Sequence, residues 1–390
     1  MACHRRYFLV ILLIFSRGLV FGQDIQKKER KWSIDGYVKD LITVNIIDGL
    51  DSTWVENQIH HRLNFKWYPT SNLSAYVEVR NRIFWGDFAK NISIYDQLVD
   101  LNNDYLDLSV VPLDRKSWVI HSMIDRAYLE WTKKDWEVRV GRQRINWGVT
   151  LVWNPNDLFN AFSFFDFDYE ERPGSDGIRI KKYTGFASSV EIASNVSDNF
   201  DELTTAGLWK VNKWDYDFQF LAGKAREDLA LGMGWAGNIG DAGFKGELTY
   251  LHPYESAMLD PAFLASLSGD YSFESSLYLH GAFYLNSAGE RNPSNAFLTS
   301  RIGRLNVRSL SPYKISTLLQ SSYQFHPLVT GGMAVIFYPG SNAMFVNPNV
   351  SFSLKKNLDL DLISQLFFDK VNDQYKAANK FVFLRVKWSY

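Results

Sequence analysis

The 390-residue chain contains one cysteine, Cys3, near its start. A disulfide within the chain is therefore excluded, and so is a small fold held together by disulfides. No segment has the roughly 18 consecutive apolar residues of a membrane-spanning helix. The formal net charge is only −1 at pH 7, and we expect no nucleic-acid partner.

The motifs of common catalytic and metal sites are also missing. The sequence has no P-loop, no His-Glu-x-x-His, no Gly-x-Ser-x-Gly and no cysteine–histidine set with metal-ligand spacing. His60 and His61 are neighbours on an expected strand and face opposite sides, so they cannot share one metal in regular geometry. We expect no enzyme activity, no catalytic residues, no cofactor and no metal. Two alternatives are a hydrolase using His121 or His326 and a calcium site among the acidic residues Asp96, Asp100, Asp104 and Asp107.

The first 22 residues have the pattern of a cleaved signal peptide. Arg5 and Arg6 precede an uncharged apolar run over residues 7–15, and small Gly22 ends the segment. The run has about half the length that a bilayer-spanning helix needs, so we expect cleavage after Gly22. A retained membrane anchor is the alternative.

Aromatic residues make up 16% of the chain, which is a large share for a soluble domain. Segments 32–39, 58–67 and 75–82 alternate apolar with polar residues, as a strand with two different environments requires. The alternation recurs to the C terminus. It predicts about eighteen strands, with 16–18 as the expected range.

The expected connections alternate in length. Short ones such as 68–72 and 133–135 are followed by mostly longer ones, notably 84–121, 144–173, 286–312 and 370–378. A secreted β-sandwich, the alternative that composition leaves open, has no reason to alternate loop length in this way. The pattern predicts an all-β fold, a transmembrane antiparallel up-and-down barrel with short periplasmic turns and long extracellular loops.

The expected organisation follows from these patterns. Residues 1–22 form the signal peptide, residues 23–31 a short periplasmic segment, and residues 32–390 the barrel. A barrel of about eighteen strands is too wide to fill with side chains, so its lumen holds water and its apolar face meets lipid. We expect the bacterial outer membrane as its location and outer-membrane lipid as a partner.

The last strand ends on alternating outward residues that include Trp388 and Tyr390. A terminal aromatic residue is typical of the assembly signal of outer-membrane barrels, although phenylalanine is the usual one. We therefore expect the barrel assembly machinery as a further partner.

Charged residues gather on the expected inner faces of strands two to six. This set sums to more positive than negative charge and would attract anionic solutes. Its members are Arg62, Glu78, Arg80, Arg82, Arg126, Glu130, Glu137, Arg139 and Arg179. The alternative is that these charges pair with each other and only hold the wall together.

The connection 144–173 is longer than a hairpin needs. It is also rich in aromatic residues, whose exposure to water is unfavourable. We expect it to fold into the barrel mouth, as a constriction or as a platform on which a sugar ring stacks. A patch that packs against a neighbouring subunit is the alternative. The residues assigned to this constriction are Arg142, Arg144, Trp147, Trp153, Asn154 and Asp157.

A family resemblance rests on about forty residues here. A strand ends in Gly-Arg-Gln at 141–143, a tryptophan-containing loop carries Asn-Pro-Asn-Asp at 154–157, and Gly-Ile-Arg at 177–179 opens the next strand. This resembles the porin-like outer-membrane proteins of the Bacteroidetes, and is more loosely similar to the alginate-export porin group. The resemblance implies an eighteen-stranded barrel and a basic constriction formed by Arg139, Arg142, Arg144 and Arg179. Strict alternation turns Arg142 and Arg144 away from Arg139, so either a bulge lies near Gly141 or both residues belong to the loop.

The combined expectation is a passive channel for small hydrophilic, anionic solutes. An export channel for an acidic polysaccharide and a non-conducting barrel receptor are the alternatives. The solute, the direction of transport and the oligomeric state stay open. An oligomer would leave some strands less apolar outside, and strand 202–211 gives the only hint of that.

Overall fold

The computed structural model describes residues 30–47, 52–100, 104–168, 170–172, 174–254, 259–293, 305–341, 343–371 and 374–390. The expected signal peptide and all but the last two residues of segment 23–31 lie outside this part of the chain. Residues 1–31 and 32–390 form separate units. The description that follows concerns the second unit.

Within the described ranges, nineteen strands make up one sheet. They are β1 (Trp32–Ile47), β2 (Ser52–Thr70), β3 (Leu73–Gly86), β4 (Ser109–Arg115), β5 (Trp118–Lys133), β6 (Trp136–Gln143), β7 (Ser175–Tyr183), β8 (Ser189–Asn195), β9 (Thr204–Lys213), β10 (Tyr216–Ala225), β11 (Asp228–Ile239), β12 (Ala242–Pro253), β13 (Ala262–Ser272), β14 (Leu277–Asn286), β15 (Ile315–His326), β16 (Val329–Phe337), β17 (Ala343–Lys355), β18 (Leu358–Val371) and β19 (Gln374–Ser389). The short helices are α2 (Asp87–Asn91), α3 (Tyr95–Val99), η1 (Phe200–Glu202) and η2 (Val307–Ser309).

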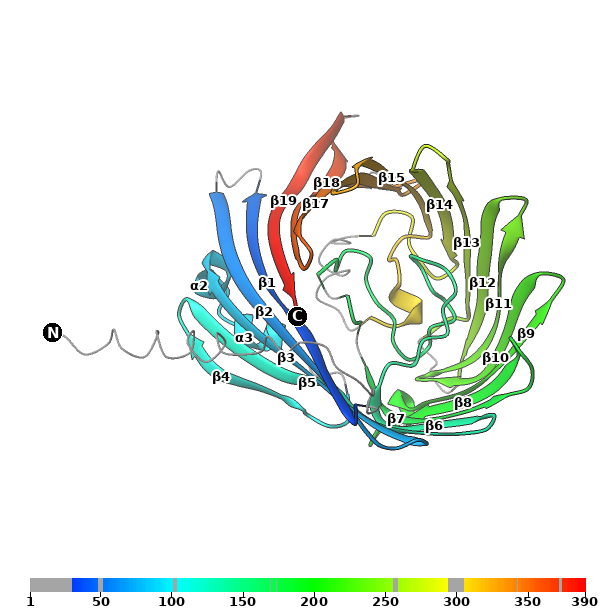
Figure 1. The fold of residues 1–390 in the computed structure, drawn as a ribbon. Coiled ribbons are helices and arrows are strands. Elements are labelled where there is room, and N and C mark those ends of the chain that lie inside the picture. Colours follow the sequence, from blue (N-terminus) through cyan, green and yellow to red (C-terminus); the bar gives the residue numbers. More distant parts are fainter. Residues whose placement is uncertain are drawn as a thin grey trace. The chain divides into compact units, whose positions relative to one another are not determined.

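The sheet closes on itself into a barrel (Figure 1). Each strand pairs antiparallel with its neighbour, and β19 pairs with β1 to complete the ring. β4 stands outside the ring, because β3 pairs directly with β5 and β4 lies beside the part of β5 that extends past β6. The closed ring thus has 19 − 1 = 18 strands, which confirms the expected barrel. No helix in the described ranges is both long and apolar enough to cross a membrane.

The two ends of the barrel differ. At one end, here called the turn end, tight turns such as 134–135 and 214–215 join the strands, and both Trp32 and Tyr390 lie there. At the other, the loop end, α2, α3 and β4 follow β3, and a long connection lies between β6 and β7. The alternation of connection lengths expected from the sequence is confirmed for most of the ring. The expected long connection 370–378 is wrong, because strand pairing extends β18 to Val371 and starts β19 at Gln374, and β10 and β11 are likewise joined by two residues only, 226–227.

The outer face of the barrel is apolar and exposed. Leu231 on β11 and Leu129 on β5 are 60% and 53% exposed, whereas the arginine Arg62 on the inner face of β2 is fully enclosed. A strand turns successive side chains to opposite faces, so the apolar–polar alternation of the sequence becomes an apolar outside and a polar inside. The expected outward placement of Trp388 and Tyr390 is confirmed by their 47% and 40% exposure.

Two irregularities turn extra charged residues inward. A bulge in the β3–β5 pairing skips Asp125, and both Asp125 and Arg126 are buried. In β6, Gly141 has φ 119°, a conformation in which a Cβ would lie 2.2 Å from the Ala127 carbonyl oxygen. The strand continues without a register shift, and Arg142 after it is buried in β6. Arg142 therefore belongs to the strand, whereas Arg144 follows the strand and belongs to the loop.

Candidate functional site

The connection between β6 and β7, residues 144–174 and here called the inner loop, packs against the inner faces of the strands. Its first half is anchored by Glu247 of β12. The two carboxylate oxygens accept hydrogen bonds from the backbone N–H groups of Val149, Thr150 and Asn156, at 2.5, 2.9 and 2.8 Å. One buried side chain thus replaces the strand partners that this irregular backbone lacks.

Two tryptophans fix the same half of the loop to other strands. The Trp147 indole N–H donates to the Glu191 carboxylate of β8 at 2.6 Å, and Gln219 of β10 donates to the Trp147 carbonyl at 2.6 Å. Trp153 stacks on Tyr284 of β14 with ring centroids 5.5 Å apart. Both tryptophans are at least 96% buried, so they are not exposed for a sugar ring, and the expectation of a stacking platform is wrong for these two residues.

Small residues on the inner face of β11 let the loop approach the wall. A Cβ on Gly232 would lie 2.5 Å from the Asn156 side-chain oxygen. The Asn156 amide donates to the Met233 carbonyl at 3.0 Å and accepts from Thr249 at 2.8 Å. A larger side chain at position 232 would push Asn156 off the wall.

The second half of the loop packs against the opposite side of the ring. Phe165 packs edge-on against Phe345 of β17, with centroids 4.9 Å apart, and its carbonyl accepts from Gln365 of β18 at 2.8 Å. Phe167 contacts Phe383 of β19 at 4.8 Å. These contacts bury aromatic rings that would otherwise face a wet lumen.

Ion pairs hold the end of the loop to the closing seam of the barrel. Lys39 of β1 is fully enclosed and lies 2.9 Å from the Asp168 carboxylate, and Lys387 of β19 lies 2.7 Å from Glu170. Burial raises the pKa of Asp168, but the hydrogen bond from His60 and the charge of Lys39 outweigh it and leave this pKa below its usual range. Asp168 is therefore charged at neutral pH.

Taken together, contacts of the inner loop extend from β8 through β14, β17 and β19 to β1, so the loop crosses the lumen. This agrees with the expected inward folding and contradicts the alternative of a patch against a neighbouring subunit. Asn154 and Asp157 are also buried in the loop. Tyr169 and Pro173 lie outside the described residues.

Asp157 is a buried carboxyl group within the inner loop. Burial raises the pKa of Asp157 to about 8, and Arg144 opposes that rise. Its Oδ1 accepts from the Trp147 backbone N–H at 3.4 Å. At pH 7 this group is mostly protonated, so the loop core carries less negative charge than its sequence indicates.

The inward arginines are paired with carboxylates. Arg62 bonds to both Glu78 and Asp125, and Arg142 bonds to Asp176 through two nitrogens at 2.8 Å. These contacts match the sequence-based alternative of paired wall charges. The further pairs are Arg80–Asp125, Arg139–Glu130, Arg139–Glu137 and Arg179–Glu137.

Arg126 and Arg82 also bond to backbone carbonyl groups. Arg126 donates to the carbonyl groups of Glu171 and Arg172 at 2.9 and 2.6 Å, which ties β5 to the end of the inner loop. Arg82 donates to the Val99 carbonyl at 2.6 Å at the end of α3. Both arginines therefore also hold segments inside the barrel mouth.

Sequence reasoning missed the second inward segment, α2 with α3. Tyr95 packs edge-on against Phe84, which is buried on the inner face of β3. The signal was weak, because each helix has only five residues, too few to show an apolar side by periodicity. This segment narrows the loop end from the β2–β5 side.

The acidic residues considered for calcium are engaged otherwise. Asp100 lies 2.9 Å from His121, and Asp107 accepts from Ser109. Within the described ranges, no three His, Cys, Asp or Glu residues are grouped as metal ligands. The geometry therefore does not support a calcium site at these residues.

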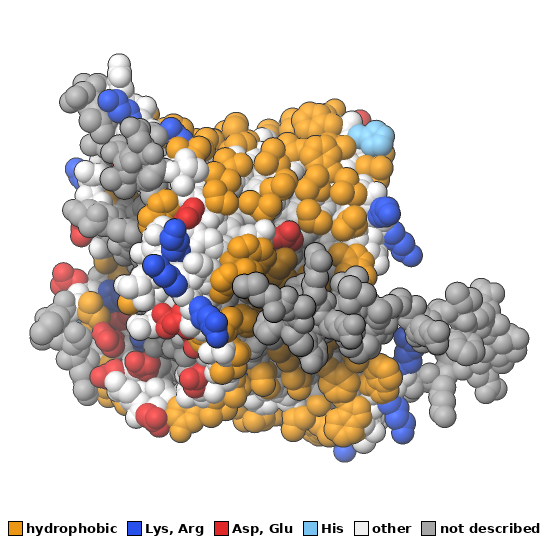
Figure 2. Space-filling view, turned by 90° about the vertical axis from the view of Figure 1, so that its left-hand side faces the viewer, with side chains coloured by type: hydrophobic (Ala, Val, Ile, Leu, Met, Phe, Trp, Pro, Cys, Tyr) orange, Lys and Arg blue, Asp and Glu red, His pale blue; other side chains and the backbone are white. Residues whose placement is uncertain are grey.

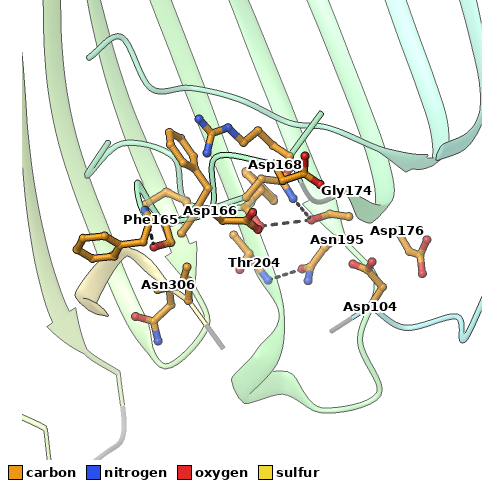
Figure 3. A pocket seen from close by; sticks show the side chains of 18 of the residues that line it. Asp104, Phe165, Asp166, Asp168, Gly174, Asp176, Asn195, Thr204 and Asn306 are labelled. Carbon is orange, nitrogen blue, oxygen red and sulfur yellow. Dashed lines mark hydrogen bonds between the residues drawn. The ribbon is translucent and has the colours of Figure 1, made fainter. Parts of the chain in front are cut away.

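A cavity of about 900 Å³ lies at the loop end, between the inner loop and the segments around it (Figure 3). Asp166, Asp168 and Asp176 line it, together with Asn195 and Thr204, whose hydrogen bond is drawn there. The charged residues of its lining are Glu56, Asp104, Asp166, Asp168, Asp176, Asp198, Glu202, Arg172 and Arg226. Carboxylates thus outnumber arginines at this mouth.

No protein-family model and no curated protein matches the chain. Several solved structures match the chain in fold. The outer membrane protein OprD from Pseudomonas aeruginosa has a TM-score of 0.59 at 8% identity, covering 92% of this chain and 93% of that one. OccAB3 of Acinetobacter baumannii gives 0.58 at 11% identity, covering 92% and 99%. OccK5, or OpdH, of Pseudomonas aeruginosa gives 0.57 at 10%, covering 92% and 98%.

The chain shares the barrel fold of these proteins. At such low identity the likeness concerns architecture alone. The resemblance to Bacteroidetes porin-like proteins and to the alginate-export group stays a prediction, and so do the individual roles of the residues described above.

Proposed function

We propose that the protein is a passive channel of the bacterial outer membrane for small hydrophilic solutes. The observation that carries the proposal is the inner loop, which crosses the lumen of a wide barrel and is fixed to strands on opposite sides of the ring. A loop anchored in this way narrows a wide lumen, as a size-selecting channel requires.

The outer surface supports a membrane location. Exposed tryptophans of the turn end, such as Trp67 and Trp388, and the stacked pair Trp85 and Trp118 towards the loop end border a mainly apolar zone, which polar side chains such as Asn81 interrupt. Aromatic residues at both borders of an apolar zone are typical of barrels in lipid.

The charge of the solute is the finer part of the proposal. The basic wall expected from the sequence favours anions, but Arg62, Arg139 and Arg179 share their charge with carboxylates. The cavity at the loop end is lined mainly by acidic residues. We therefore propose only a weak anion preference, which arises on the turn-end side of the inner loop, where Lys181 of β7 and Lys210 of β9 face the lumen.

Conductance of the refolded protein in planar bilayers tests the proposal. Stable single-channel steps are expected, with a small reversal potential of anion-selective sign in a salt gradient. Deletion of residues 150–165 should widen the channel and raise the conductance. A folded barrel that stays silent in both forms would contradict a channel and favour a receptor, whereas conductance only after the deletion would favour a closed export channel.

A further inference from the structure

Two lysines flank one tryptophan on the outer face of the barrel, at its turn end. Lys133 of β5 pairs in register with Trp136 of β6, and Trp136 pairs in register with Lys182 of β7. Residues paired in this way have Cβ atoms about 5 Å apart, so the three side chains form one row across the strands. The Lys182 ammonium group lies 5.2 Å from the centre of the Trp136 ring.

The row points away from the lumen. Trp136 is 43% exposed, and Lys133 and Lys182 are exposed as well. Trp131, two residues before Lys133 on β5, is 40% exposed, whereas Glu137, the neighbour of Trp136 on β6, is buried on the inner side. Successive residues of a strand alternate between the two faces, so all three side chains of the row lie on the outer surface.

The row lies at the border of the apolar surface. The next outward row towards the loop end consists of Trp131, Val138, Ile180 and Ile192, which pair in register across β5, β6, β7 and β8. Ile180 and Ile192 are 36% and 57% exposed, as residues that face hydrocarbon are. Two residues of a strand span about 7 Å. In the proposed membrane location the two lysines therefore lie where lipid headgroups replace hydrocarbon.

The two ammonium groups are accessible to an anion from outside. Within the described ranges, the ion pairs of β5, β6 and β7 lie on the inner face, and none involves Lys133 or Lys182. Asp135, in the turn between β5 and β6, is exposed and forms no ion pair with either lysine. A lysine ammonium carries three hydrogen-bond donors, and phosphate oxygens are strong acceptors for them.

The basic border covers only part of the ring. Lys213, at the end of β9, lies 4.4 Å from the centre of the Trp214 ring, so the β9–β10 hairpin repeats the combination of lysine and tryptophan. The turns 240–241, 273–276 and 327–328, which follow β11, β13 and β15, contain no lysine or arginine. Figure 2 shows one side of the wall, with lysine and arginine side chains in blue at the right-hand edge of the hydrophobic surface.

We propose that Lys133, Trp136 and Lys182 bind the phosphate of an anionic phospholipid in the periplasmic leaflet. The phosphate oxygens accept hydrogen bonds from both ammonium groups, and the acyl chains pack on the apolar row that begins at Trp131. An anionic headgroup is favoured because no carboxylate pairs with the two cations. The inference rests on the proposed membrane location, but it does not depend on conduction, because the site lies outside the lumen.

Native mass spectrometry of the protein in detergent tests the inference. Dioleoyl-phosphatidylglycerol is titrated in parallel with dioleoylglycerol, which has the same acyl chains and no phosphate. The wild type should bind the phospholipid more tightly. Lys133→Gln with Lys182→Gln should weaken this binding by about 20- to 30-fold, because each lysine near an anionic lipid contributes a factor of roughly five. Lys133→Arg with Lys182→Arg keeps both charges and should keep the binding.

The matched control is Lys66→Gln with Lys245→Gln. It removes the same charge from the inner face, where these lysines pair with Asp35 and Asp270, and should leave lipid binding unchanged. Equal weakening by the two glutamine pairs would overturn the inference, because net charge would then explain the effect.

Two further results would also overturn the inference. One is equal affinity of the wild type for the two lipids, and the other is displacement of the phospholipid by sodium phosphate, which would assign the lysines to free phosphate. Heat-modifiable migration and conductance show that each variant folds. A conducting wild type without lipid preference would therefore contradict this inference while leaving the proposed channel in place.

Discussion

Glu247 of β12 and Asn156 of the inner loop are joined at 2.8 Å by a backbone N–H that points into a buried carboxylate. The same carboxylate also receives the N–H groups of Val149 and Thr150. This one strand residue holds the first half of a long irregular segment against the wall, so the width of the proposed channel should depend on it.

Replacing Glu247 should release the loop. Glu247→Ala leaves three buried N–H groups without an acceptor, at a cost of about 1–3 kcal/mol for each. We expect a barrel that still forms, with higher conductance and more open-channel noise than the wild type. Single-channel recording measures both, and Glu247→Gln, which keeps one acceptor oxygen, should lie between them. Unchanged noise in the alanine variant would contradict the anchoring role.

The packing of the loop should depend on pH through Asp157. The raised pKa of about 8 means that the packed loop binds a proton that a released loop, with an ordinary carboxyl pKa near 3.9, gives up. The contribution of Asp157 to the free energy that favours the packed loop is therefore full below about pH 4. It is lost as the pH rises through about 8, by at most about 1.4 kcal/mol per pH unit.

Open-channel noise and protease cleavage of the loop between pH 5 and pH 9 measure this effect. Both should increase with pH in the wild type and lose most of that dependence in Asp157→Asn. The charged neighbours Arg144, Arg172 and Glu247 remain in the variant and serve as its internal control. An identical pH dependence in both proteins would assign the effect to another group.

Glu137 should tune the ion selectivity. Its carboxylate pairs with Arg139 and Arg179, so Glu137→Gln leaves two guanidinium groups with less compensation. The reversal potential in a salt gradient should shift towards stronger anion preference by a few millivolts to tens of millivolts. Glu274→Gln, in the turn after β13, changes the net charge equally and should shift it far less. Equal shifts would mean that net charge, not the wall pair, sets selectivity.

Gly141 should be intolerant of a side chain. Gly141→Ala places a Cβ against the Ala127 carbonyl in a backbone with φ 119°, so we expect a loss of about 1–3 kcal/mol and a lower folding yield. The yield of heat-modifiable barrel after refolding measures this. Gly207→Ala, whose Cβ would find only contacts of 3.8 Å or more, is the matched control.

Much of the barrel could be predicted because strand alternation is local. Residues 75–82 show which side faces water without any knowledge of the neighbouring strands, and β3 confirms that assignment. The number of strands in the ring follows in the same way. β4 was missed because it pairs only along the extension of β5, and nothing in its own seven residues distinguishes it from a loop.

The inner loop was predicted to turn inward because its aromatic residues are costly in water, but its partners could not be predicted. Trp153 packs on Tyr284, and Phe167 packs on Phe383. The two residues of each pair are far apart in sequence and come into contact only when the ring closes. The positive charge expected for the lumen is reduced for the same reason. The register of β5, β6 and β7 places Arg139 and Arg179 beside Glu137.

The sequence by itself determined the barrel, its approximate strand number, its apolar outer face and the inward course of residues 144–173, because these depend on patterns within single segments. Tertiary structure alone decided that the arginines are paired and that Trp147 and Trp153 are buried. Each of these depends on how strands far apart in sequence are aligned, and hydrogen-bond register between strands is a property of the closed sheet.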